Sequence, residues 1–163
     1  MGGSPLLIID VQKGFINEWT AHVPARVESL QDSFDQIIIT RLYNPQRSLY
    51  RRLTGWSEFS LGATETQLAF APLGRATIID KSTYNGVDEL LLASFRAERV
   101  NRVHLCGIAT EDSVLLTAAG LFEQGIEPVV LAHACGSDAG HGLHQAGLQI
   151  ISRLIGPKQV IGS

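Results

Sequence analysis

The sequence lacks long apolar runs and has few cysteines. No stretch of the 163 residues approaches the ~18 consecutive apolar residues of a membrane helix. The two cysteines, Cys106 and Cys135, lie in apolar runs typical of buried strands, which argues against a disulfide-rich secreted protein and indicates a reduced, cytoplasmic setting. Residues 1–4 carry no secretion signal, so we expect a disordered start or a tag remnant before one domain over 5–163.

Charge is also sparse. Only 18% of the residues are charged and the formal net charge is −3. The basic residues form no run beyond the pair Arg51 and Arg52, so we expect no nucleic-acid surface. A hydrophobic content of 45% is typical of a compact globular domain with a sizeable core. Composition therefore favours neither nucleic acid nor a membrane as a partner.

Short apolar runs alternate with segments of helical periodicity along the chain. The predicted strands cover residues 5–9, 36–42, 76–82, 102–108, 128–134 and 158–161. The predicted helices cover residues 24–34, 48–53, 88–98, 112–124 and 139–154. This alternation predicts a single-domain α/β fold: a Rossmann-like three-layer sandwich, in which a mostly parallel sheet of five to six strands has helices on both faces.

Three polar residues fall at or just beyond predicted strand ends, where parallel sheets carry their sites. Asp10 and Lys81 each follow an apolar run, and a buried charge is costly unless it is paired. We therefore expect them to form an ion pair, which can be structural or functional. Ser113 lies near a helix start, where free backbone N–H groups suit either a capping serine or a nucleophile beside an oxyanion site.

Four segments resemble motifs of one family. They are IIDVQKGF at 8–15, DKSTYNG at 80–86, GIATEDSV at 107–114, and the segment from Cys135 to Leu148. Together and in this order they resemble the isochorismatase-like cysteine hydrolases, which include nicotinamidases, N-carbamoylsarcosine amidohydrolases and isochorismatases. The resemblance covers nearly the whole chain.

The resemblance implies a role for each motif. Asp10 would be the general base, and Lys81 would lower the pKa of the nucleophile and stabilise negative charge. Ser113 stands at the nucleophile position. The family has a cis peptide in this turn, here between Ile108 and Ala109, which would aim the N–H groups of Ala109 and Ser113 at one oxyanion. The family also implies a homodimer or larger homo-oligomer, and we expect no cofactor.

Ser113 departs from the pattern, because amide-hydrolysing members carry cysteine there. Three interpretations stay open. An engineered Cys→Ser change would retain binding and remove most chemistry, since a thiol is partly ionised near neutral pH and a hydroxyl is not. An isochorismatase-type member would cleave a vinyl ether with an Asp as proton donor and no covalent intermediate. A non-catalytic relative would bind a small molecule or serve as a scaffold.

A second departure concerns metal. Nicotinamidases carry an Asp-Trp-His-Pro stretch after the second strand, and here Leu42 and Asn44 replace its first two ligands, so we expect no metal. His141 and His144 have a spacing that can ligate metal, but an exposed helix face is the simpler interpretation. A third departure, His133 in place of an aspartate, has no explanation from the sequence.

The loops after the strands supply the expected pocket walls. The candidate substrate-binding residues are Phe15, Trp19, Arg41, Asn44, Trp56 and Tyr84. If Arg41 turns inward, its planar guanidinium suits a substrate carboxylate, whereas the aromatic residues can equally be core or subunit contacts. The resemblance therefore implies a small-molecule substrate and a hydrolase of a small carboxamide or ureido C–N bond, slowed or inactive because position 113 is serine.

Overall fold

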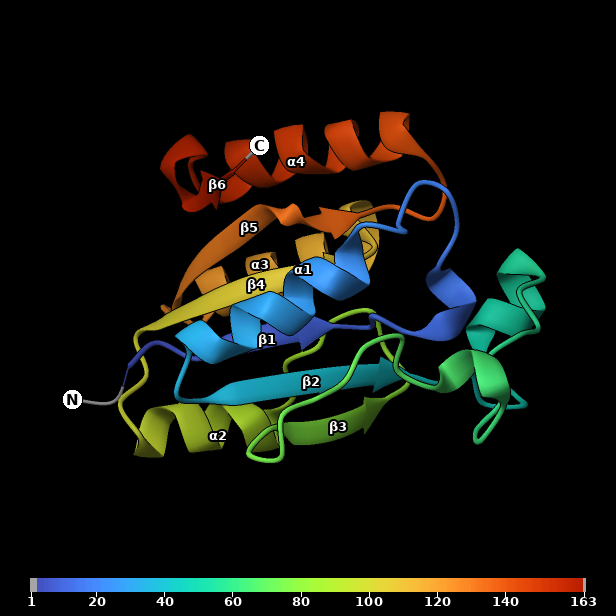
Figure 1. The fold of residues 1–163 in the computed structure, drawn as a ribbon, viewed down its shortest axis with the longest axis horizontal. Coiled ribbons are helices and arrows are strands. Elements are labelled where there is room, and N and C mark those ends of the chain that lie inside the picture. Colours follow the sequence, from blue (N-terminus) through green and yellow to red (C-terminus); the bar gives the residue numbers. More distant parts are fainter. Residues whose placement is uncertain (1–2, 163) are drawn as a thin grey trace.

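A six-stranded parallel sheet forms the centre of the computed structural model, which describes residues 3–162. The strand order is β3-β2-β1-β4-β5-β6, and every neighbouring pair runs parallel. The strands are β1 Leu6–Ile9, β2 Ile37–Leu42, β3 Thr77–Lys81, β4 Arg102–Ile108, β5 Glu127–Gly136 and β6 Val160–Ile161. This arrangement confirms the predicted α/β fold (Figure 1).

The burial of each strand agrees with its place in the sheet. All four residues of β1 are buried apolar side chains, as expected for a central strand covered on both faces. The edge strand β3 is mostly exposed, and Ile78 keeps 41% of its surface accessible. The sequence run that predicted β3 therefore marks an edge strand, in which one face stays in contact with water.

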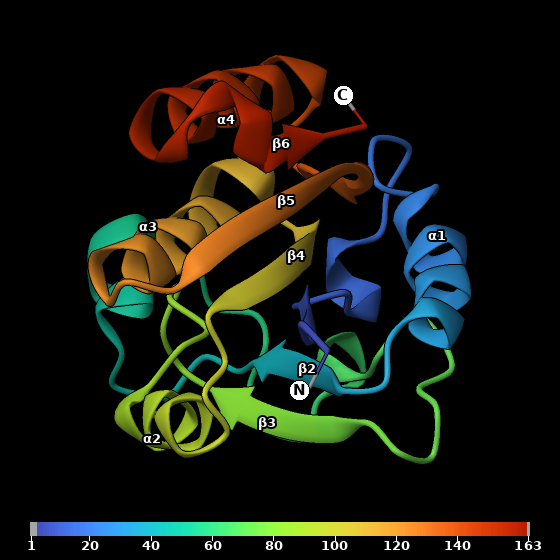
Figure 2. The same cartoon turned by 90° about the vertical axis from the view of Figure 1, so that its left-hand side faces the viewer.

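Helices cover both faces of the sheet. Figure 2 shows α1 on one face and α2 and α3 on the opposite face, with α4 beside α3 near the β5 and β6 edge. The α-helices are α1 Val23–Leu30, α2 Glu89–Ala97, α3 Leu115–Glu123 and α4 His141–Ile155. Short 3₁₀ turns cover Lys13–Phe15, Gln31–Ser33, Thr64–Thr66 and Pro157–Gln159. Within residues 3–162, no helix has the length and apolarity needed to cross a membrane.

Two predicted helices begin or end elsewhere than the periodicity suggested. The helix predicted over 24–34 ends at Leu30, because the buried Gln31 side chain bonds to the backbone of Ala71 and Leu73 and fixes a turn there. The helix predicted over 112–124 becomes α-helical only at Leu115, after a wide π-type turn over Thr110–Val114.

The region after β2 and the first described residues of the chain contain little regular structure. The short helix predicted over 48–53 is a single π-type turn over Tyr50–Thr54. Of the segment predicted as a disordered start, Met1 and Gly2 lie outside the described residues, and Gly3 and Ser4 belong to no element. The domain bounds of 5–163 stay a prediction.

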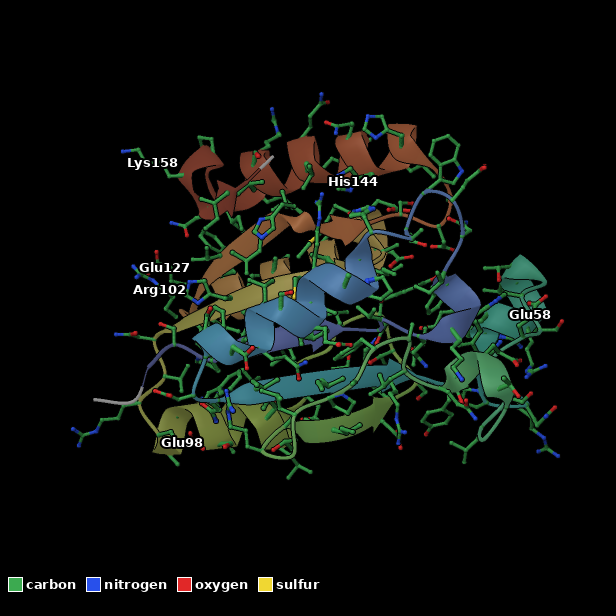
Figure 3. The ribbon with its side chains drawn as sticks, in the orientation of Figure 1. Glu58, Glu98, Arg102, Glu127, His144 and Lys158 are labelled. Atoms are coloured by element: carbon green, nitrogen blue, oxygen red, sulfur yellow. The ribbon has the colours of Figure 1, made fainter. Side chains whose placement is uncertain are left out.

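The strand register gathers the candidate residues at one edge of the sheet. Ile9 lies opposite Thr40 on one side and Gly107 on the other, and Leu42 lies opposite Lys81. The carboxyl ends of these strands therefore meet at the right-hand side of Figure 1. At the opposite end, Figure 3 shows the exposed pair of Arg102 and Glu127, whose side chains join at 2.7 Å.

Gly107 is required where β4 passes β1. Its φ is +129°, and a Cβ there would collide with the carbonyl oxygen of Ile9. We expect Gly107→Ala to lower the free energy of unfolding by at least about 2 kcal/mol, measured by urea denaturation. Gly142→Ala, where a Cβ meets nothing within 4 Å, is the control and should be neutral or slightly stabilising. Equal stability of the two variants would contradict this account.

Candidate active site

A buried ion pair joins the ends of β1 and β3. The Lys81 ammonium lies 2.7 Å from Oδ2 of Asp10, and the two residues are 9% and 1% exposed. The same ammonium donates to the backbone carbonyls of Thr83 at 2.6 Å and Tyr84 at 3.2 Å. All three N–H donors of the Lys81 ammonium are therefore hydrogen-bonded, which offsets the free-energy cost of burying its charge.

Thr40 holds the other carboxylate oxygen of Asp10, and the backbone turns at this residue. The Thr40 hydroxyl donates to Oδ1 of Asp10 at 2.7 Å. Asp10 itself has a φ of +51°, in the left-handed region that aspartate tolerates better than most residues. This local geometry turns the chain at the end of β1 and holds the carboxylate against Lys81.

The turn after β4 carries the third candidate residue. The peptide bond between Ile108 and Ala109 is cis. Ser113 follows within the π-type turn and is 2% exposed. Its carbonyl accepts the Thr117 hydroxyl at 2.6 Å, which ties the turn to α3.

A cavity of about 230 Å³ opens beside this turn. Its walls combine aromatic and apolar side chains with polar groups of the β4–α3 turn. The lining residues are Phe15, Leu42, Thr54, Trp56, Tyr84, Ile108, Ala109, Asp112, Ser113 and Asp138. Asp10 and Lys81 do not line this cavity themselves. Two residues bound to Lys81 do: Leu42 is its register partner, and the Tyr84 carbonyl accepts a hydrogen bond from its ammonium.

The pKa of Tyr50 is raised by burial and by charges from both the ion pair and the β4–α3 turn. Burial raises the pKa of Tyr50, and the charges of Tyr84, Asp10 and Asp112 raise it further. Its ring makes an edge contact with that of Tyr84, with centroids 5.1 Å apart. The phenol of Tyr50 is thus close enough to be affected by the charges of both Asp10, which follows β1, and Asp112, in the β4–α3 turn.

The structure brings some of the predicted pocket residues together and separates others. Phe15, Trp56 and Tyr84 line the cavity. Arg41 does not turn inward, because its guanidinium pairs with Asp80 at 2.7 Å on the surface. Asn44 is buried and donates to the Trp56 carbonyl at 2.8 Å, so it supports the wall without lining it.

Trp19 lines a different hollow, of about 460 Å³, between α1, β5 and α4. This second hollow also contains His22, His133, His141 and His144. The carbonyl of His133 accepts the guanidinium of Arg26, and Nδ1 of His144 lies 2.7 Å from the Thr110 hydroxyl. His144 appears in Figure 3 on α4. The departure from the family pattern at His133 thus lies at this hollow.

Sequence reasoning missed two acidic residues of the cavity, Asp112 and Asp138. Oδ1 of Asp112 accepts the N–H of Ala109 at 3.3 Å and also the N–H of Ser113. Burial raises the pKa of Asp112 to about 6, against the lowering effect of these two bonds. The sequence offered one indication of this role. Asp112 is the third residue after Ala109, and a carboxylate at that spacing can accept the backbone N–H of the residue at the start of the turn.

Neither cysteine is placed to act as a nucleophile. Cys106 and Cys135 are fully buried, and neither lines the cavity. Burial raises the pKa of Cys106 well above its usual value and raises that of Cys135 to about 12. Both thiols therefore stay protonated and pack as small apolar groups.

No group of three or more metal-ligating side chains is arranged to hold an ion within residues 3–162. At the positions where nicotinamidases carry their first two ligands, Leu42 lines the cavity and the Asn44 amide bonds to the Trp56 backbone. An apolar side chain and an occupied amide do not suit a transition metal.

Comparison with known proteins finds one family and one fold over nearly the whole chain. A sequence model described as the isochorismatase domain matches residues 4–157. No curated protein matches the sequence. The structure is similar to a pyrazinamidase/nicotinamidase from Streptococcus mutans UA159, with a TM-score of 0.82 and 20% identity over 98% of this chain and 100% of that one.

Two further solved structures have the same fold. A nicotinamidase from Bacillus subtilis has a TM-score of 0.82 and 18% identity, over 98% of this chain and 99% of that one. An N-carbamoylsarcosine amidase from Thermoplasma acidophilum has a TM-score of 0.74 and 18% identity, over 92% and 94% of the two chains. At these identities the likeness establishes a common fold over nearly the whole chain.

Proposed function

Because the chain belongs to the isochorismatase domain family, we propose that it hydrolyses a small carboxamide or ureido C–N bond, slowly, with Ser113 at the nucleophile position. The observation that carries the proposal is the buried pair of Asp10 and Lys81, 2.7 Å apart, beside a cavity that Ser113 lines. A buried ion pair is expensive to keep for stability alone. Nicotinamidases and an N-carbamoylsarcosine amidase of the same fold act on substrates of this bond type.

The proposed reaction uses the three residues in sequence. Asp10 accepts the proton of the nucleophile, which attacks the substrate carbonyl carbon. The developing oxyanion is stabilised by the N–H groups of Ala109 and Ser113. Asp10 returns the proton to the departing amine or ammonia, and water then cleaves the acyl-enzyme. Lys81 holds the negative charge of Asp10 in place.

The cavity limits the size and nature of the substrate. About 230 Å³ accommodates a small molecule, and the rings of Phe15, Trp56 and Tyr84 offer apolar faces to a flat one. Arg41 and Asn44 are engaged elsewhere, so we do not assign a carboxylate-recognition role to either. The homo-oligomeric state and the cytoplasmic location stay predictions.

A second candidate, hydrolysis of a vinyl ether without a covalent intermediate, is favoured by one observation. Asp112 lines the cavity, and its pKa of about 6 lets it hold a proton in mildly acidic solution. A carboxyl that keeps its proton can act as a general acid. This chemistry needs no thiol, which is consistent with serine at position 113.

Replacing Ser113 with cysteine tests the proposal. We expect Ser113→Cys to raise ammonia release from a panel of small carboxamides and ureides at least about tenfold, because a thiol supplies a far better nucleophile than a hydroxyl. Ser137→Cys is the matched control, since it places a thiol at another buried serine that does not line the cavity. It should leave the rate unchanged.

The other outcomes decide between the alternatives. If both forms leave amides intact while the present protein cleaves a vinyl ether, the second candidate is correct. If neither reaction occurs and a small ligand binds with an affinity that Asp10→Ala does not alter, the protein is a non-catalytic binding protein.

A further inference from the structure

The two backbone N–H groups that the proposed mechanism needs for the oxyanion already have an acceptor. Ala109 donates to Oδ1 of Asp112 at 3.3 Å, and Ser113 donates to the same oxygen. Asp112 lines the cavity together with both of these residues. A negatively charged oxygen of the chain itself thus lies where the reaction would form one.

We propose that the Asp112 carboxylate is a plug in this anion site, which a substrate oxygen or a small anion must displace to bind there. Asp112 then determines what the site accepts. The inference rests on the proposed function only in identifying this position as the oxyanion site. Occupancy of the position by Asp112 does not depend on any reaction.

The charges around Asp112 make the plug displaceable. Glu111 in the same turn and Asp138 after β5 add like charge, and both raise the pKa of Asp112. Tyr84 after β3 and Tyr50 after β2 face it as neutral phenols whose own pKa values its charge raises. Lys81, whose ammonium bonds to the Tyr84 carbonyl at the edge of this region, is already paired with Asp10. Within residues 3–162, the carboxylate is therefore held by the two N–H groups and by the start of the helix.

The direction of the pH dependence follows from burial. Burial penalises the ionised form, so the carboxyl gains its proton below a pKa of about 6 and carries charge above it. The ionised plug accepts the two N–H bonds strongly and repels other anions. Protonation removes the charge, weakens both bonds and lets an anion compete. The site is therefore closed above about pH 6 and opens as the pH falls.

A purely structural role for Asp112 is the rival account. Its side chain reaches back to the Ala109 N–H in the manner of a capping box, which stabilises a helix start without any ligand. A cap and a plug differ in one measurable respect, because only the plug competes with an added anion. Stability alone does not separate the two roles.

Benzoate is the probe, because its carboxylate matches the plug and its ring suits the aromatic walls. We expect Asp112→Ala to bind benzoate at least about tenfold more tightly than the unaltered protein at about pH 8, measured by calorimetric titration. Asp138→Asn is the matched control: it removes a charge from the same cavity without vacating the two N–H groups. Because Asp138→Asn also lowers the repulsion of an anion, a small gain in benzoate affinity is expected, but one of about threefold or less, clearly smaller than that of Asp112→Ala.

Asp112→Asn separates charge from occupancy and also serves if the alanine variant fails to fold. Its amide oxygen still accepts both N–H groups but does not titrate. We expect benzoate binding by the unaltered protein to strengthen from about pH 8 to about pH 5.5, and this dependence to vanish in Asp112→Asn. A cap alone predicts a lower melting temperature for Asp112→Ala with unchanged benzoate affinity, and that result, or an unchanged pH dependence in Asp112→Asn, overturns the proposal.

Benzoate binding requires no turnover, so the two proposals fail separately. Tight binding by Asp112→Ala, with no amide hydrolysis by Ser113→Cys, would sustain the plug and refute the amidase. Hydrolysis by Ser113→Cys, with no gain of affinity in Asp112→Ala, would sustain the amidase and refute the plug.

Discussion

Lys81→Met should lower the free energy of unfolding by about 3–5 kcal/mol. The variant leaves the Asp10 carboxylate, which is 1% exposed, without its partner at 2.7 Å. It also removes the donor to the Thr83 and Tyr84 carbonyls. The remaining bond from the Thr40 hydroxyl comes from a neutral donor and does not replace the lost positive charge.

Urea denaturation measures this loss, and Arg41→Met provides the control. Arg41 pairs with Asp80 at the same distance of 2.7 Å, but at the surface. Exposed ion pairs contribute only about 0–1 kcal/mol, so the control should differ little from the unaltered protein. A comparably small loss in Lys81→Met would mean that the buried charge finds other compensation, contrary to the described geometry.

The double variant Asp10→Asn with Lys81→Met keeps the test informative if the single variant does not fold. Removing both charges leaves no uncompensated ion, so the double variant should lose less stability than the sum of the two single losses. The difference is the coupling energy of the pair. Strict additivity would contradict a direct interaction between the two residues.

The periodicity of the sequence predicted the strands because each is a short apolar run between polar boundaries. Leu6–Ile9 is apolar throughout, and the structure buries it at the centre of the sheet. Helix boundaries were less predictable where side chains compete with the backbone. Gln31 ends α1 through hydrogen bonds to Ala71 and Leu73, which lie 40 and 42 positions further along the chain. No local sequence pattern contains that information.

The candidate site, too, was predictable from the sequence only in part. Asp10 and Lys81 were predictable as partners because each is a charge at the end of an apolar run. The direction of the Arg41 side chain was not predictable, since it is set by the ion pair with Asp80 on the neighbouring strand. Asp112 was overlooked as a site residue because a helix-capping residue and an anion-site ligand have the same sequence signature, and only the cavity distinguishes them.

Asp10→Asn, made in the Ser113→Cys protein, should reduce kcat for a small amide by about 10²–10⁴-fold. The neutral amide cannot accept the proton of the nucleophile or return it to the leaving group. The substrate cavity is lined by other residues, so KM should change much less than kcat. Steady-state kinetics separate the two constants, provided that a cooperative urea transition shows the variant to be folded.

Asp80→Asn distinguishes this chemical role from a general effect of lost charge. Asp80 precedes Lys81 in β3 and pairs on the surface with Arg41, so the same substitution there removes a carboxylate without reaching the cavity. We expect it to retain nearly full kcat. If Asp10→Asn changed KM and kcat equally, Asp10 would act in binding. If it lowered stability but not kcat, the ion pair would be structural and the proton acceptor would be another group, for which Asp112 is the nearest candidate in the cavity.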